Sequence, residues 1–310
     1  MIITVTMNPA IDKTVDIEEL KKGCINRLEQ VIYDAGGKGI NVSKTIKELG
    51  GSSIATGFLG SCGGDTISKC MVEYGIASEF VMIDGDTRTN LKILEKDGTI
   101  TEINEAGPVI DENEIIQLRK TLLRYAGPGS IFIFAGSVPT GVPKDIYKVC
   151  SEELIRKGSQ IFLDAEGELF AQAIDAIPHI IKPNSHELEA YFKCDHKASQ
   201  DELIDMGKKL IEMGIQLVII SLGEEGALFL VGNDVYICRS IDVEKHSTVG
   251  AGDAMVGAIA YGLDKGLTLE ECMTLSVATS TGAVMTQGTK PPTRAMVDEI
   301  LNKIKAEQVI

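Results

Sequence analysis

One short segment, residues 247–258 with the sequence STVGAGDAMVGA, places a carboxylate among glycines at the start of an apolar, helix-like run. Gly250 and Gly252 permit backbone angles that turn N–H groups toward one point. The start of a helix adds unpaired N–H donors and partial positive charge there, which together favour an anion such as phosphate. Because Asp253 would repel a resting phosphate, we expect it to accept the proton of a hydroxyl group that is being phosphorylated.

Two other interpretations of this segment stay open. Asp253 could simply cap the helix, as aspartate often does. Gly250 and Gly252 could also begin a dinucleotide-binding turn, although Met255 stands where that pattern has its third glycine. The P-loop pattern and the signatures of protein kinases are absent from the chain, so neither of those kinase types fits.

Other candidate residues lie in separate segments. The glycine-rich run Gly36-Gly37-Lys38-Gly39-Ile40-Asn41-Val42 leads into a helix and is either a second anion site or a tight turn with a surface lysine. Asp12 follows the first strand, at the edge of an α/β sheet where ligands bind. Asn184 and Glu187 share the first turn of a helix, a spacing that suits either Mg²⁺ or a cap. If the substrate is phosphorylated, we expect three cationic side chains from separate segments to lie around it: Arg27, Lys38 and Arg88.

The order of the predicted elements indicates the fold. Short β-branched runs alternate with amphipathic stretches along most of the chain, which predicts an α/β protein with a mostly parallel sheet covered on both faces. Residues 13–34 and 86–105 do not follow this alternation of strands and helices, and Asp97-Gly98 predicts a hairpin in the second stretch. We expect these stretches to pair as a small β-sheet lid over the carboxyl edge, and the last helix to span 293–306.

The composition narrows the class of protein. The formal net charge of −15 over 310 residues argues against nucleic acid as a partner, because binding a phosphate backbone needs basic surface. Seven cysteines without a C-x-x-C pair predict reduced thiols in a cytoplasmic protein, and the four histidines lack the spacing of a zinc site. The N-terminus lacks the features of a signal peptide, and no run of about eighteen apolar residues predicts a membrane span.

Four motifs occur together, in order: Gly36–Val42, Lys182-Pro183-Asn184-x-x-Glu187, Ser221-Leu222-Gly223-x-x-Gly226 and Ser247–Gly257. In order and spacing they resemble the ribokinase-like sugar kinases of the phosphofructokinase B family, and the resemblance covers essentially the whole chain. It implies one three-layer α/β/α kinase domain over residues 1–310, with a small β-sheet lid that often pairs between two subunits. It also implies ATP and Mg²⁺, and transfer of a phosphoryl group to a hydroxyl of a sugar phosphate.

The same resemblance implies a role for each matching residue. Asp253 would be the catalytic base, beside an anion hole formed by Gly250, Ala251 and Gly252. The sugar would be held by Asp12, Gly37, Lys38, Asn41 and Ser137, and its phosphate and neighbouring hydroxyls by Arg27, Arg88 and Asn90. The nucleotide phosphates and Mg²⁺, through water, would be served by Lys182, Asn184 and Glu187. The rest of the ATP site would be lined by Ser221, Gly223, Gly226, Val277 and Thr281. A K⁺ ion would use the carbonyl groups of Ser247, Val249, Ala283, Thr286 and Gly288.

The expected reaction converts fructose 1-phosphate and ATP to fructose 1,6-bisphosphate and ADP, in a cytoplasmic homodimer that pairs through the lid. Within the same family, tagatose-6-phosphate kinase and 6-phosphofructokinase are the alternatives. Two other classes stay open: a nucleotide-binding oxidoreductase, and a catalytically silent sugar-phosphate sensor of the same fold. The intact Gly250-Ala251-Gly252-Asp253 run argues against the silent sensor.

Overall fold

The centre of the protein is a sheet whose first strand, β1 (Ile2–Thr6), is buried at every residue. The structure is a computed structural model that describes residues 1–310. On its two sides β1 pairs in parallel with β4 (Ser53–Leu59) and β8 (Ile131–Ala135). A strand that is buried on both faces must be covered by helices on both, and such strands are rich in β-branched residues, as β1 is.

Seven strands of this sheet run parallel and three more extend it antiparallel. The parallel strands follow the order β5 (Ala77–Met82), β4, β1, β8, β9 (Gln160–Asp164), β10 (Ile180–Ile181) and β11 (Leu217–Ser221). The antiparallel edge consists of β12 (Ala227–Val231), β13 (Asp234–Cys238) and β14 (Ala306–Gln308). The mostly parallel sheet expected from the strand–helix rhythm is therefore confirmed.

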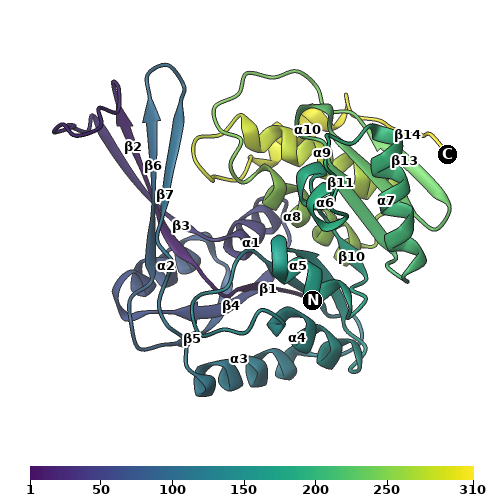
Figure 1. Ribbon diagram of the computed structural model, residues 1–310, viewed down its shortest axis with the longest axis horizontal. Coiled ribbons are helices and arrows are strands. Elements are labelled where there is room, and N and C mark those ends of the chain that lie inside the picture. The colour runs from purple at the N-terminus through teal and green to yellow at the C-terminus, as the bar shows by residue number, and fades with distance from the viewer.

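Helices cover both faces of the large sheet, so the expected three-layer arrangement is also confirmed (Figure 1). Ile3 and Val5 share one core with α3 (Glu112–Tyr125), α4 (Ile146–Ile155), α5 (Gly167–Ile174), α6 (Ser185–Tyr191) and α7 (Gln200–Glu212). Ile2 and Ile133 share the other core with α1 (Lys38–Glu48), α8 (Ala251–Lys265), α9 (Leu269–Val284) and α10 (Arg294–Leu301). None of the helices is both long enough and apolar enough to cross a membrane.

A second sheet of four strands stands beside the helical body, at the left of Figure 1. We call it the lid, and its order is β3 (Gln30–Gly36), β2 (Ala10–Ile17), β6 (Arg88–Glu95) and β7 (Ile100–Asn104). β2 and β6 are parallel, whereas β3 and β7 pair antiparallel with their neighbours. The expected small sheet is present, and the Asp97-Gly98 turn joins β6 to β7, with Gly98 at a φ of 89° that glycine adopts readily.

The lid is positioned by strands that run directly into helices of the body. β3 ends at Gly36 and α1 begins at Lys38, so that only Gly37, with a φ of 117°, separates the lid from this helix. A Cβ atom on Gly36 would lie 2.5 Å from the Asp12 side chain, which explains the absence of a side chain there. Gly36 therefore serves the close approach of two lid strands, β3 and β2, as well as any ligand.

The expected C-terminal helix over residues 293–306 is wrong in its second half. α10 ends at Leu301, and Ala306–Gln308 instead form β14, which pairs with β13. The unpaired N–H and C=O groups of an edge strand favour such an addition. Helix α2 (Ser61–Tyr74) also begins four residues earlier than Asp65, the expected start, with non-helical backbone angles at Cys62 and Gly63.

Candidate active site

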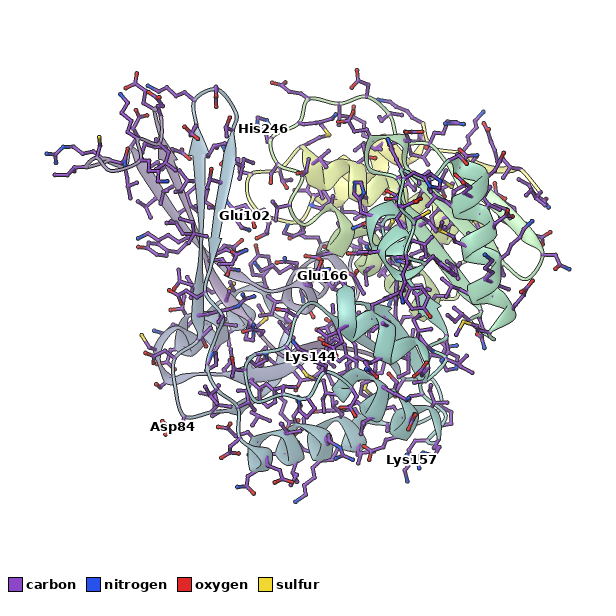
Figure 2. All side chains as sticks on the ribbon, in the orientation of Figure 1. Asp84, Glu102, Lys144, Lys157, Glu166 and His246 are labelled. Atoms are coloured by element: carbon purple, nitrogen blue, oxygen red, sulfur yellow. The ribbon has the colours of Figure 1, made fainter.

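A cleft of about 1140 Å³ lies between the lid and the large sheet. Figure 2 shows Glu102 on the lid and Glu166 near the start of α5 on opposite sides of this space. The cleft is lined by most of the residues expected to carry function: Asp12, Gly37, Lys38, Asn41, Arg88, Asn90, Ser137, Lys182, Asn184, Glu187, Ser221, Gly223, Gly226, Val249, Gly250, Ala251, Gly252, Asp253, Val277 and Thr281. Segments that are distant in the sequence thus meet around one cavity.

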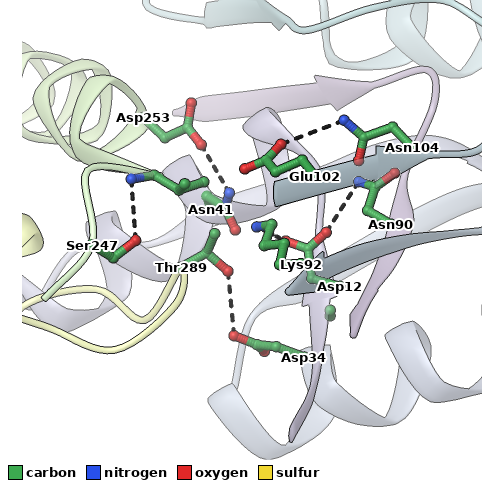
Figure 3. Close-up of polar contacts among 12 residues, drawn as sticks. Asp12, Asp34, Asn41, Asn90, Lys92, Glu102, Asn104, Ser247, Asp253 and Thr289 are labelled. Atoms are coloured by element: carbon green, nitrogen blue, oxygen red, sulfur yellow. Dashed lines mark hydrogen bonds and ion pairs between the residues drawn. The ribbon is translucent and has the colours of Figure 1, made fainter. Parts of the chain in front are cut away.

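Asp253 lies in the first turn of α8, on the cleft. Gly250 precedes the helix with a φ of 87°, and the helix begins at Ala251, so the N–H groups of residues 251–253 have no partner within the helix. The Asp253 carboxylate does not cap the helix but accepts a hydrogen bond of 2.8 Å from Nδ2 of Asn41 (Figure 3). The interpretation of Asp253 as a helix cap is therefore wrong, and its other oxygen is left without a protein donor.

The environment of Asp253 suits a proton acceptor. Burial raises the pKa of its carboxyl group to about 6, and the nearby charge of Asp164 adds to the increase, while Lys38, Asn41 and Lys182 oppose it. A carboxylate with a raised pKa binds a proton more strongly and is still charged at neutral pH. Asp253 can thus take a proton from a hydroxyl group without being protonated beforehand.

A second buried carboxylate, Asp164, lies at the end of β9 between two lysines. Its Oδ1 is 3.6 Å from Nζ of Lys38 and 3.3 Å from Nζ of Lys182. Only 1% of Asp164 is exposed, and neither of its oxygens has a partner in hydrogen-bond geometry. Burial alone would raise the pKa of this carboxyl group, but the two ammonium charges outweigh burial and lower it. Asp164 in turn raises the pKa of Lys38, so the group remains charged.

Asp164 is a site residue that the sequence analysis missed. It follows a buried strand directly, as Asp12 does, and the rule that places ligands at the carboxyl edge of the sheet could have singled it out. No glycine-rich motif of the kind found at residues 36–39 and 250–252 marks its position in the sequence.

The side chain of Lys182 packs against the first turn of α8. A Cβ atom on Gly252 would lie 3.3 Å from Nζ of Lys182, so the absence of a side chain leaves room for the ammonium group beside the first turn. An anion at this point would meet both the lysine and the free N–H groups of the helix. The geometry therefore supports an anion site in front of Asp253.

Asn184 and Glu187 form a capping box at the start of α6. Oδ1 of Asn184 accepts from the N–H of Glu187 at 2.8 Å, and Oε2 of Glu187 accepts from the N–H of Asn184 at 2.9 Å. Burial raises the pKa of Glu187, although its hydrogen bond from the backbone of Asn184 opposes the shift. Asn184 and Glu187 therefore cap the helix, as one of the two interpretations expected. Oε1 of Glu187 takes no part in the capping box.

The oxygen groups in the cleft fit a magnesium ion that arrives with a nucleotide. No cluster of three or more His, Cys, Asp or Glu side chains is arranged to hold a metal by itself. Mg²⁺ commonly binds through one or two carboxylates, with water and phosphate oxygens completing its shell. Asp164, whose oxygens lack hydrogen-bond donors, and Glu187 supply groups of that kind.

On the lid side of the cleft, Asp12 is held by two neighbours on β6. Nδ2 of Asn90 donates to its Oδ1 at 3.1 Å, and Nζ of Lys92 lies 2.9 Å from its Oδ2. The Arg88 guanidinium is fixed by the carbonyl groups of Asn8 and Glu105. Lys92 is the second site residue that the sequence analysis missed, since a lysine in an alternating hairpin strand gives no sign of which side chain it faces.

Five expected residues do not line the cleft. Arg27 is exposed on the loop between β2 and β3. The other four belong to the set expected around K⁺: Ser247, Ala283, Thr286 and Gly288. The Ala283 carbonyl accepts hydrogen bonds from both N–H and Oγ1 of Thr286, so a cation there would share an oxygen that already has two donors.

Helices on both faces of a mostly parallel sheet, with a separate small sheet over its carboxyl edge, define a ribokinase-like kinase. The model of the pfkB family carbohydrate kinases matches residues 5–296, and the chain belongs to this family. It is therefore a phosphotransferase with an alcohol group as acceptor.

Relatives and solved structures agree with this assignment over nearly the full length. The chain is 33% identical to 1-phosphofructokinase of Bacillus subtilis over 100% of both chains. It is 36% identical to 1-phosphofructokinase of Borreliella burgdorferi over 92% of both. Phosphofructokinase-2 from Escherichia coli in complex with potassium superposes with a TM-score of 0.92 at 27% identity, covering 97% of this chain and 98% of that one.

The first prediction concerns the base. Asp253→Asn should lower kcat by roughly 10² or more, since the amide cannot take the proton, and should leave ATP binding nearly intact. The same variant should unfold at a higher temperature than wild type at pH 8, because burial disfavours the charge that the substitution removes. Turnover near that of wild type would refute the assignment of Asp253, and equal melting temperatures would contradict its burial cost.

The second prediction concerns pH. Because the pKa of Asp253 is raised to about 6, the wild-type carboxyl group becomes protonated as the pH falls through that value. The wild-type value of kcat/KM should therefore decline below about pH 6, and the stability advantage of Asp253→Asn should shrink over the same range. A rate profile that stays flat down to pH 5 would contradict a base with this pKa.

Proposed function

We propose that this protein transfers the γ-phosphoryl group of ATP to fructose 1-phosphate, producing fructose 1,6-bisphosphate and ADP. The observation that carries the proposal is the buried Asp253 at a helix N-terminus, facing a cleft with cationic residues on both sides. The full-length relatives named 1-phosphofructokinase support this choice of acceptor.

Each half of the cleft holds one substrate. Lys182 would hold the phosphates of ATP, which supplies the transferred group, and Asn184 and Glu187 would hold its Mg²⁺ through water. Asp253 takes the proton of the acceptor hydroxyl as the new bond forms. The N–H groups of Ala251 and Gly252 donate to the oxygens of the phosphoryl group in transit, where negative charge is spread.

The acceptor side is built for a phosphorylated sugar. Asp12, Asn90 and Asn41 provide acceptors and donors for hydroxyl groups, together with Gly37, Lys38 and Ser137. Arg88 supplies the fixed guanidinium for the phosphate that the sugar already carries. Arg27 lies outside the cleft of its own chain, and it would serve that phosphate only from a moved lid loop or from a second copy.

A coupled assay of ADP release over a panel of acceptors tests the proposal. The panel contains fructose 1-phosphate, tagatose 6-phosphate, fructose 6-phosphate and free fructose. We expect the highest kcat/KM with fructose 1-phosphate. A preference for tagatose 6-phosphate or fructose 6-phosphate would instead assign one of the related activities, and no ADP from any acceptor would refute a kinase function.

The third prediction separates the two substrates. Arg88→Ala should raise the KM for the sugar phosphate about tenfold or more and leave the KM for ATP unchanged, because hydrogen bonds to charged groups contribute about 1.5–3 kcal/mol. Arg156→Ala, which removes an exposed arginine from α4's C-terminal end, is the matched control. Equal changes in both KM values would remove Arg88 from the acceptor site.

A homodimer through the lid is the second part of the proposal. The face of the lid that points away from Asp12 carries Tyr33, Lys13, Leu91 and Ile103 in one cross-strand row, with Tyr33 61% and Ile103 55% exposed and the Lys13 ammonium group over the Tyr33 ring. A second copy offers the same aromatic and aliphatic side chains, so that two lids can cover each other about a twofold axis. One solved form of Escherichia coli phosphofructokinase-2 is tetrameric, which supports self-association in this fold.

The fourth prediction tests the dimer. Wild type should have the mass of two chains in light scattering at micromolar concentration, and Tyr33→Glu with Ile103→Glu should shift it to one chain, because two buried charges would face each other. Val72→Glu, at a 78% exposed apolar residue of α2, is the control and should stay dimeric. A monomeric wild type would refute the proposal.

Two smaller points complete the proposal. Potassium would bind the carbonyl groups of Ser247, Val249, Ala283, Thr286 and Gly288, and the potassium in the Escherichia coli neighbour supports this. A cytoplasmic location is supported by the seven cysteines, all of which stand as free thiols.

A further inference from the structure

Lys92 and Asp12 form an ion pair on the lid (Figure 3). The two side chains are 2.9 Å apart, and the residues are only 7% and 5% exposed. Both line the cleft, where the acceptor is proposed to bind. A buried ion pair at a binding surface can orient a group that binds the ligand as well as stabilise the fold.

The register of the lid explains how the two side chains meet. In the parallel pair β2–β6, Asp12 lies opposite Asn90 and Thr14 lies opposite Lys92. Side chains two residues apart on one strand share a face, so Asn90 and Lys92 both lie beside Asp12 on the face toward the cleft. Each of the two donates to a different oxygen of the Asp12 carboxylate.

A second carboxylate was available to Lys92. Glu102 lies directly opposite Lys92 in the antiparallel pair β6–β7 and also lines the cleft. Lys92 nevertheless pairs with Asp12, and Glu102 accepts only a long hydrogen bond of 3.4 Å from Asn104. The lysine therefore compensates the more buried of its two neighbouring carboxylates.

From this geometry we infer that Lys92 is a positioning residue for acceptor binding, and the inference rests on the proposed function. Its ammonium group holds the buried Asp12 carboxylate in one direction, so that the remaining lone pairs of that carboxylate accept hydrogen bonds from adjacent hydroxyl groups of a sugar phosphate. Lys92 acts through Asp12 and not by touching the acceptor. A carboxylate that is buried without a compensating charge is strongly disfavoured, which is why the lysine is needed.

The fifth prediction is a double-mutant cycle on acceptor binding. Lys92→Met should raise the KM for the sugar phosphate at least tenfold, with the KM for ATP and the kcat at saturating acceptor changed less than threefold. In the Asp12→Asn background the same substitution should change the acceptor KM less than twofold, since the carboxylate it acts on is gone. Lys96→Met removes an exposed lysine of the lid outside the cleft and is the control.

The outcomes are distinct. An equal rise in acceptor KM with and without Asp12 would mean direct contact with the acceptor and would overturn the inference. A loss of kcat in proportion to the unfolded fraction, measured by thermal unfolding, would mean a purely structural role and would also overturn it. If Lys92→Met fails to fold, recovery of folding in Asp12→Asn/Lys92→Met would support the pairing, and failure of both would overturn it. A wrong proposed function would appear earlier, as inactive wild type in the acceptor panel.

Discussion

The buried carboxylate of Asp164, between the ammonium groups of Lys38 and Lys182, is the interaction on which the rest of the site depends. It joins the end of β9 to the first residue of α1 and to the segment before α6, three elements that are far apart in the sequence. Two cations alone in a buried cleft would repel each other, and one carboxylate keeps both in place. Burial is the main cause of the raised pKa of Asp253, and the negative charge of Asp164 adds to it, so Asp164 acts on Asp253 as well as on the two lysines.

The lid is a single sheet with two unlike faces. Its polar face, with Asp12, Asn90 and Lys92, lines the cleft. Its other face carries Tyr33, Leu91 and Ile103, and strict alternation along the strands makes the two faces inseparable. A shift of register by one residue would exchange them and destroy both, which explains why the β2–β6 pairing runs without interruption over eight residues.

Much of this arrangement could be predicted from the sequence, because its signals are local. Short β-branched runs predicted the parallel sheet, Asp97-Gly98 predicted the hairpin, and the glycines before α8 predicted a helix start whose N–H groups are free. Strand β14 could not be predicted, because three residues without a pattern pair with an edge that only the folded protein provides. Lys92 and Asp164 were missed for a related reason: their partners are identified by cross-strand register and by burial, which no local pattern contains.

The single hydrogen bond from Asn41 to Asp253 has a consequence for the choice of hydroxyl. A sugar phosphate carries several hydroxyl groups of similar acidity, and proton removal alone would not distinguish them. Because Asn41 donates to Oδ2, Oδ1 is the oxygen of Asp253 that has no protein donor, and in the proposed mechanism it is the better placed of the two to accept a substrate proton. If Asp253 is the base, as we propose, regioselectivity follows from this geometry: the favoured hydroxyl is the one that reaches Oδ1 while it faces the anion site.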